Sequence, residues 1–246
     1  MNKYNESVKA LALPQTFDER VFVADASCPQ ALCDFILSLA LMFNDFKDIV
    51  LGHQLVQTVL PESRDPSREL GQAGGISEHL FRMLMAVIHE LLVLLDKSRN
   101  AMTHPVFQRV VKKLHPEARH AWKTLSSLQV GPNSKSPVAQ LVFFARNKVA
   151  FHYDVKALAA GYRASFLTEP NKSPYISRAL SMAGTRFYFA DAAAQRLMRD
   201  TANPAIVDDF FSAKLGIFLQ INHAIREVVA VFVQLRTEDL RRKRPA

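Results

Sequence analysis

One short stretch of the chain, FFARNKVAFHYD, carries side chains that could act on a phosphate group (residues 143–154). Arg146, Asn147 and Lys148 follow one another in an otherwise apolar segment, and His152 comes six residues after the arginine. A histidine can take up or release a proton near neutral pH. An arginine can hold a phosphate with two hydrogen bonds. These residues are therefore either chemical groups or structural ones, and the segment around them decides between the two.

The segment 137–153 is expected to be a helix that is buried on several sides, because its apolar residues lie around most of the circumference. In an ideal α-helix, residues six positions apart differ by about 120° in direction and by about 9 Å along the axis. Arg146 and His152 would then not share one face. A buried arginine needs a partner, and in the structural interpretation Arg146 pairs with Glu90 while His152 only caps the helix. The acidic candidates for this pairing are Asp45, Asp48 and Glu90.

The string of Arg146, Asn147, four further residues and His152, in a helix of an all-α chain, resembles the signature of the HEPN superfamily. That signature is an arginine, a polar residue directly after it, and a histidine four to six residues beyond; here the gap is five residues. The resemblance covers the helical core, at about 27–160, and implies metal-independent RNA cleavage at a site formed across a homodimer. It implies that His152 transfers protons as the 2′-hydroxyl attacks phosphorus, that Arg146 stabilises the charge and that Asn147 orients either group. Lys148 and Glu90 are expected to have supporting roles.

The same resemblance implies a biological setting, namely a toxin–antitoxin or phage-defence system with RNA as the substrate and an antitoxin or other protein as a partner. Many HEPN-like domains have no nuclease activity. A second interpretation therefore stays open, in which the chain is a non-catalytic helical module that binds a partner protein or a nucleotide. An Arg146 exposed in a cleft would favour the enzyme, and an Arg146 sealed in a salt bridge with Glu90 would favour the module.

The elements that must position these residues are expected to be helices only. Apolar runs bounded by proline, glycine and capping residues predict an all-α chain, an antiparallel bundle of about seven helices. Ser77 is expected to begin one helix and Gly161 to end another. We expect a single domain over 1–246, with a C-terminal helical extension at about 175–240. The helices are predicted at about 27–60, 77–99, 104–128 with an interruption at Pro116, 137–153, 154–161, 176–200 and 205–240.

The net charge of +8 is concentrated in one part of the chain, because residues 101–135 contain six Lys and Arg but one acid, Glu117. A basic surface attracts polyanions such as RNA, although many basic faces are only solvated. Trp122 lies among these cations and fits either a stacking platform for a base or the core. The predicted RNA-binding residues are Arg109, Lys112, Lys113, Arg119 and Lys123.

Several other kinds of site are disfavoured by the residue pattern. Cys28 and Cys33 have no second cysteine pair to complete a metal site, and they are expected to be reduced thiols. Glu117 and His120 have the E-x-x-H spacing of di-iron bundles, but a second such motif is missing. The longest apolar runs are shorter than a membrane span, and the first residues lack a signal pattern. We therefore expect a cytoplasmic protein without a metal, a cofactor or a membrane segment.

Overall fold

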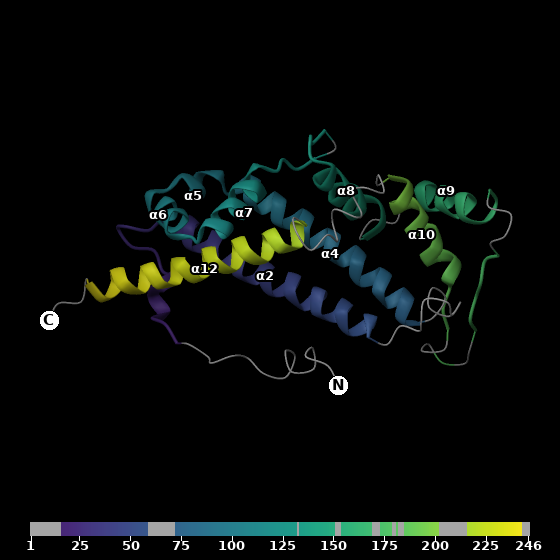
Figure 1. Ribbon diagram of the computed structural model, residues 1–246, viewed down its shortest axis with the longest axis horizontal. Coiled ribbons are helices and arrows are strands. Elements are labelled where there is room, and N and C mark those ends of the chain that lie inside the picture. Colours follow the sequence, from purple (N-terminus) through teal and green to yellow (C-terminus); the bar gives the residue numbers. More distant parts are fainter. Residues whose placement is uncertain are drawn as a thin grey trace. The chain divides into compact units, whose positions relative to one another are not determined.

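The computed structural model describes most of the chain, and the described part is all-α (Figure 1). It contains nine α-helices, and its β-structure is limited to two isolated bridges. The described residues are 16–58, 72–131, 133–150, 154–168, 173–178, 181, 185–201 and 216–242. The α-helices are α2 (Gln30–Gln57), α4 (Gln72–Lys97), α5 (Arg99–Thr103), α6 (Pro105–Lys113), α7 (Pro116–Ser127), α8 (Pro137–Ala145), α9 (Val155–Phe166), α10 (Tyr188–Thr201) and α12 (Ile217–Arg242). Two short elements complete the described fold, the 3-10 turn η1 (Glu19–Phe22) and the π-helical turn η2 (Arg146–Ala150).

The chain divides into two compact units, each assembled from segments that are distant in sequence. The first unit consists of residues 1–46, 90–130 and 208–246, and the second consists of residues 47–89 and 131–207. The predicted HEPN-like motif therefore belongs to the second unit, and the predicted RNA-binding residues belong to the first. The expected single domain and its boundary near residue 160 stay predictions.

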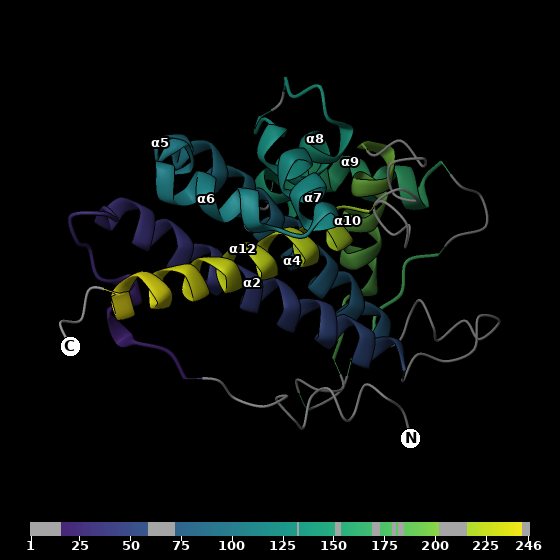
Figure 2. The same ribbon diagram turned by 60° about the vertical axis from the view of Figure 1, so that its left-hand side comes forward.

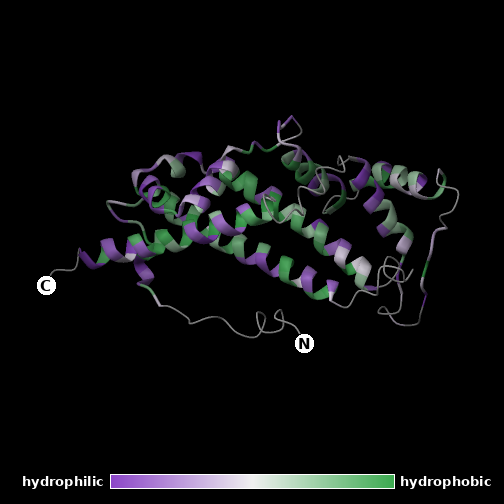
Figure 3. Cartoon of the chain, in the orientation of Figure 1, coloured by the Kyte–Doolittle hydropathy of each residue, from purple (hydrophilic) through white to green (hydrophobic). Residues whose placement is uncertain are grey.

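The core of the first unit forms where α12 packs against α7 and α6 (Figures 1 and 2). Phe107 is fully buried, and its ring centroid lies 5.7 Å from that of Phe35 and 5.3 Å from that of Trp122. Figure 3 shows apolar and polar residues alternating along α12, as expected for a helix with one buried face. The buried apolar stripe of α12 consists of Ile217, Ile221, Ala224, Ile225, Val228, Phe232 and Leu235.

A buried arginine that the sequence did not predict, Arg236, links α12 to residues 23–25 near the N-terminus. Arg236 has a fully buried side chain, which forms an ion pair with Asp25 at 3.3 Å and donates a hydrogen bond to the Val23 carbonyl at 3.3 Å. By length and composition, α12 is also the one helix in the described ranges that could cross a membrane. In the first unit it packs against α6, α7 and η1.

The second unit contains a close helix crossing between α9 and α10, which lie side by side in Figures 1 and 2. Gly161 makes this approach possible, because a Cβ atom placed there would lie 2.2 Å from the carbonyl oxygen of Ala193. Gly161 had been predicted to end a helix at this point. That prediction is wrong, since α9 continues to Phe166, and the glycine serves interhelical packing instead.

Local sequence signals otherwise predicted the helices well. α2 lies inside the range expected for it, α6 and α7 meet at the predicted break before Pro116, and Asp154 caps α9 as expected. Ser77 does not begin a helix, because it lies inside α4, which starts at Gln72. α10 begins at Tyr188 rather than near 176, and Ser177 and Arg186 form an antiparallel bridge instead. The first part of the helix expected at 205–240 lies outside the described residues.

Candidate active site

The motif residues lie at a change in helix type. The helix predicted at 137–153 is α-helical only to Ala145, and Arg146 to Ala150 form the π-helical turn η2. π-Helical turns are rare and occur frequently at functional sites. Because the angle between side chains differs in such a turn, the separation calculated for an ideal α-helix no longer applies. His152 lies outside the described residues, so its distance from Arg146 stays a prediction.

Arg146 and Asn147 form an ordered pair at the start of η2. Nη1 of Arg146 donates a hydrogen bond to Oδ1 of Asn147 at 3.2 Å, and Nδ2 of Asn147 donates to the Phe143 carbonyl at 2.8 Å. Both side chains are half-buried. The asparagine is therefore held at both ends of its amide, and it fixes one edge of the guanidinium. This orientation suits a group that must present a cation in a defined direction.

Lys148, expected to support the motif, has a partner within the second unit. Its ammonium group pairs with the carboxylate of Asp154, which also accepts a hydrogen bond from the backbone N–H of Ala157 at 3.0 Å and so caps α9. The hydrogen bond from Lys148, followed by that from Ala157, lowers the pKa of Asp154 below its ordinary value. Lys148 therefore ties η2 to the start of α9.

Glu90, the predicted partner of Arg146, is exposed in the first unit, whereas Arg146 is half-buried in the second. Neither side chain is fully buried. An ion pair between Arg146 and Glu90 stays a prediction. The buried arginine of the described chain is Arg236, whose side chain is 1% exposed. The residues around Arg236 in the sequence do not predict that it is buried, because its partner Asp25 is 211 residues away.

The predicted RNA-binding residues lie on α6 and α7 of the first unit, and all five are exposed. Two of them also have structural roles. Arg109 pairs with Asp239 of α12. Arg119 donates to the carbonyls of Val111, Lys112 and Leu114, which closes the C-terminal end of α6. Within the described ranges, the three lysines of the predicted set form no ion pair.

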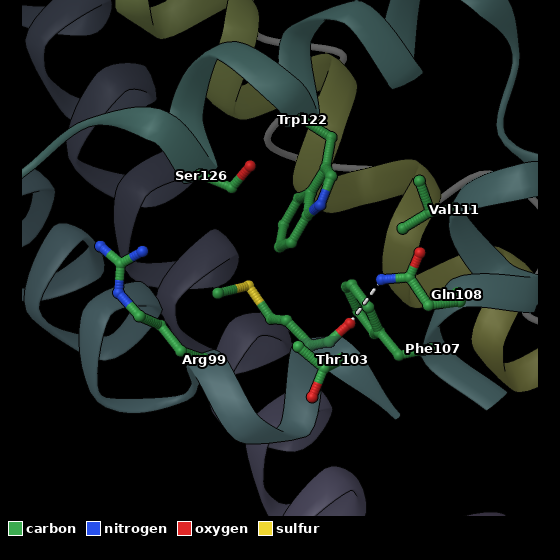
Figure 4. A pocket seen from close by; sticks show the side chains of 8 residues that line it. Arg99, Thr103, Phe107, Gln108, Val111, Trp122 and Ser126 are labelled. Carbon is green, nitrogen blue, oxygen red and sulfur yellow. Dashed lines mark hydrogen bonds between the residues drawn. The ribbon is translucent and has the colours of Figure 1, made fainter. Parts of the chain in front are cut away.

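Trp122 is a core residue at its ring faces, but it also lines two hollows at the surface of the first unit. Its side chain is 5% exposed, which excludes the open stacking platform that the sequence left as one alternative. The first hollow, called the Met102 hollow, has a volume of about 350 Å³, and the second, called the His120 hollow, has a volume of about 500 Å³. Figure 4 shows the indole ring of Trp122 pointing into the Met102 hollow.

A cluster of charged residues connects α4 to the segment that leads into α10. No sequence motif predicted this cluster. Arg186 pairs with Asp191 at 2.9 Å and donates to Gln72 Oε1 at 3.0 Å. Arg82 lies 3.7 Å from the same aspartate. Gln72 and Arg82 precede Arg186 and Asp191 by more than 100 positions, so local spacing carries no signal for the contacts between the two segments.

Helices α4 and α10 are also in contact through Glu78 of α4, whose Oε1 accepts a hydrogen bond from Nε2 of Gln195 of α10 at 3.0 Å. Burial raises the pKa of Glu78, against the opposing effect of Arg82. A carboxyl group with a raised pKa suits acid–base chemistry. Here its contacts are internal to the second unit, and they hold α4 and α10 together.

A second missed contact joins Ser77 of α4 to His53 of α2. Ser77 Oγ lies 3.0 Å from His53 Nε2 and accepts a hydrogen bond from Nε2 of Gln57 at 2.8 Å. Burial lowers the pKa of His53, so the imidazole is favoured in its neutral form. Ser77 is therefore a buried bridging group rather than a helix cap.

The described residues contain no group of three or more His, Cys, Asp or Glu side chains that could hold a metal ion. Glu117, part of the E-x-x-H string, instead lies 3.9 Å from His223 of α12. Cys28 and Cys33 are buried and unlinked, with their sulfur atoms 3.6 Å apart. Burial raises the pKa of Cys28 to about 12, so the thiol stays protonated and unreactive.

No family model matches this chain, and neither a curated protein nor a solved structure matches it. The resemblance to the HEPN superfamily therefore rests on the motif at residues 146–152 and on the all-α fold.

Proposed function

We propose that the chain is a metal-independent endoribonuclease in which Arg146, Asn147 and His152 act on the scissile phosphate. The observation that carries the proposal is the π-helical turn at Arg146–Ala150, which interrupts the helix at the motif. Within this turn Asn147 holds the guanidinium of Arg146 in one direction. A cation ordered in this way can stabilise the charge that develops on the phosphate, and a histidine six residues later in the sequence can transfer protons.

The proposed reaction uses the 2′-hydroxyl of the RNA as the nucleophile. His152 removes the proton from this hydroxyl as its oxygen attacks the adjacent phosphorus, and the 5′-oxygen of the next nucleotide leaves with a proton. Arg146 binds the non-bridging phosphate oxygens, where negative charge increases in the transition state. The products are a 2′,3′-cyclic phosphate and a 5′-hydroxyl end. A two-fold dimer brings two copies of the motif together and supplies the groups for both proton transfers.

The alternative, a non-catalytic helical module, is favoured by a different observation. Several of the predicted functional cations already have partners inside the fold. Arg109 pairs with Asp239, Lys148 pairs with Asp154, and Arg119 is bound to three backbone carbonyls. In this alternative the cations stabilise the two units, and the chain binds a partner protein or a nucleotide without cleaving RNA.

An RNA-cleavage assay in the presence of EDTA separates the two functions. The wild-type protein, Arg146→Ala and His152→Ala should be purified identically and incubated with single-stranded RNA. We expect each substitution to lower the cleavage rate by at least about 10²-fold, because a positioned general base and a transition-state cation each contribute on that scale. Arg163→Ala is the matched control, because Arg163 is an exposed arginine of α9 in the same unit, and this variant should cleave like the wild type.

Stability and assembly should be measured on the same samples. Arg146→Ala should melt within a few degrees of the wild type, because Arg146 is only half-buried. The wild type should sediment as a dimer. The nuclease proposal is wrong if the wild type shows no EDTA-resistant cleavage, or if Arg146→Ala cleaves RNA as fast as the wild type does. A stable monomer that cleaves RNA would exclude an active site formed across a dimer, but it would leave the nuclease proposal standing.

A further inference from the structure

The first unit carries two adjoining hollows whose shared wall is formed by Val111, Trp122 and Ser126. Their volumes, about 350 Å³ and about 500 Å³, fall in the range of sites that bind small organic groups. Both hollows are formed by α5, α6 and α7 alone. Their ligand therefore has to be inferred from the side chains that these three helices contribute.

Trp122 gives the Met102 hollow an aromatic edge in a fixed position. The ring packs against Phe107, at a centroid distance of 5.3 Å, and Figure 4 shows one edge of the ring pointing into the hollow. Buried tryptophans usually find a hydrogen-bond acceptor for the indole N–H. Among the described residues, nothing accepts a hydrogen bond from the indole N–H of Trp122. Trp122 therefore presents an apolar edge to the Met102 hollow, and its indole N–H is a donor beside the two hollows that it lines.

The remaining polar groups of the Met102 hollow are mainly acceptors. Thr103 and Ser126 donate their hydroxyl protons to backbone carbonyls one turn earlier, which leaves their oxygen lone pairs for a ligand. Gln108 uses its Nε2 to donate to the Met102 carbonyl at 2.7 Å, which leaves its Oε1 as an acceptor. A planar ring with both donors and acceptors along its edge, such as a nucleobase, matches this set.

Cations line both hollows. Arg99, which pairs with Asp96, lines the Met102 hollow, and Arg119 and Lys123 line the His120 hollow. Arg119 is held in place by its hydrogen bonds to three carbonyls. Glu117 is the one acid between residues 99 and 127. A ligand that extends across both hollows therefore passes from an aromatic edge to fixed positive charge, which fits a base followed by phosphates.

We propose that this surface binds an unpaired segment of RNA, with one nucleobase in the Met102 hollow and the adjoining phosphates over the His120 hollow. The choice of RNA rests on the proposed ribonuclease function. The inference adds the substrate class, which is single-stranded RNA. A duplex offers the same phosphates, but its bases are stacked and paired and cannot enter the hollow.

Tryptophan fluorescence tests this inference directly, because Trp122 is the one tryptophan of the chain. A short single-stranded oligoribonucleotide should be titrated into the His152→Ala protein, in which the proposed cleavage is blocked. We expect saturable quenching of the fluorescence. The same oligonucleotide annealed to its complement should bind at least about tenfold more weakly, because its paired bases cannot enter the Met102 hollow.

Two adjacent serines provide a matched pair of variants. Ser126→Glu places a carboxylate in the wall shared by both hollows, and should weaken binding of the single strand at least about tenfold. Ser127→Glu adds the same charge at an exposed neighbour that lines neither hollow, and should change binding less than about threefold. Far-UV circular dichroism checks the fold of both variants, and the wild-type titration stands independently of them.

The outcomes separate this inference from the nuclease proposal. Quenching that is specific for single strands, without any cleavage by the wild type, would support the RNA surface and refute the nuclease. Cleavage of RNA without a change in Trp122 fluorescence would support the nuclease and overturn the RNA surface. Equal binding of duplex and single strand, equal effects of the two serine variants, or no RNA binding at all would also overturn it.

Discussion

Asp25→Asn should unfold the protein more easily, because it leaves the buried charge of Arg236 without a counter-charge. The guanidinium of Arg236 lies 3.3 Å from Asp25 Oδ2 and 3.4 Å from Ser27 Oγ, and its side chain is 1% exposed. The other carboxylate oxygen of Asp25 accepts hydrogen bonds from the backbone N–H groups of Ser27 and Cys28. Asparagine can keep these turn hydrogen bonds through its amide oxygen, and its NH2 group, a donor, then faces the guanidinium in place of the carboxylate oxygen.

The size of the effect follows from the distance and the burial. Coulomb's law with an effective dielectric constant of about 20 gives about 5 kcal/mol for two unit charges at this separation. Asp25 is 26% exposed, so water screens part of this attraction. Removing one partner of a buried ion pair typically costs about 3–5 kcal/mol. We expect a loss of about 3 kcal/mol in the free energy of unfolding, at the lower end of that range.

Urea unfolding followed by far-UV circular dichroism measures this loss. Asp96→Asn is the matched control, because Asp96 pairs with Arg99 while both side chains are more than half exposed, and it should cost less than about 1 kcal/mol. Arg236→Met should cost less than Asp25→Asn, since it removes the buried charge as well as the attraction. Equal losses for Asp25→Asn and Asp96→Asn would show that Arg236 is solvated, and would refute the reasoning.

Two further substitutions test the second unit. Gly161→Ala should lower the free energy of unfolding by about 1–3 kcal/mol despite the better helix propensity of alanine, because its Cβ would lie 2.2 Å from the Ala193 carbonyl oxygen; a more stable variant in thermal unfolding would contradict the close crossing of α9 and α10. Glu78→Gln should stabilise the protein near neutral pH but not at acid pH. Burial raises the pKa of Glu78 above its ordinary value of 4.5, so the stability that the wild-type carboxyl group contributes is lost as pH rises through the raised pKa; melting temperatures of the two proteins that differ equally at all pH values would exclude this cause.

Helix positions in this chain were predictable where local signals determine them. Pro116 interrupts the segment between α6 and α7 because a proline is tolerated in the first turn of a helix but not in its interior. Asp154 caps α9 through a hydrogen bond that spans three residues. Signals of this kind act within one turn, so the sequence by itself determined the all-α class and most helix boundaries. It also supplied the motif of Arg146, Asn147 and His152.

Tertiary structure alone decided the roles of other residues, because those roles depend on segments distant in sequence. Gly161 looked like a helix end, but the backbone of α10 requires its small size within α9. Arg236 resembles any arginine near the end of a basic helix, yet a turn 211 residues away supplies its counter-charge and buries it. Trp122 could be a core residue or a surface platform, and its packing against Phe107 makes it a core residue that also lines two hollows. The burial of a residue depends on every segment that packs around it, so it cannot be predicted from the neighbouring residues in the sequence alone.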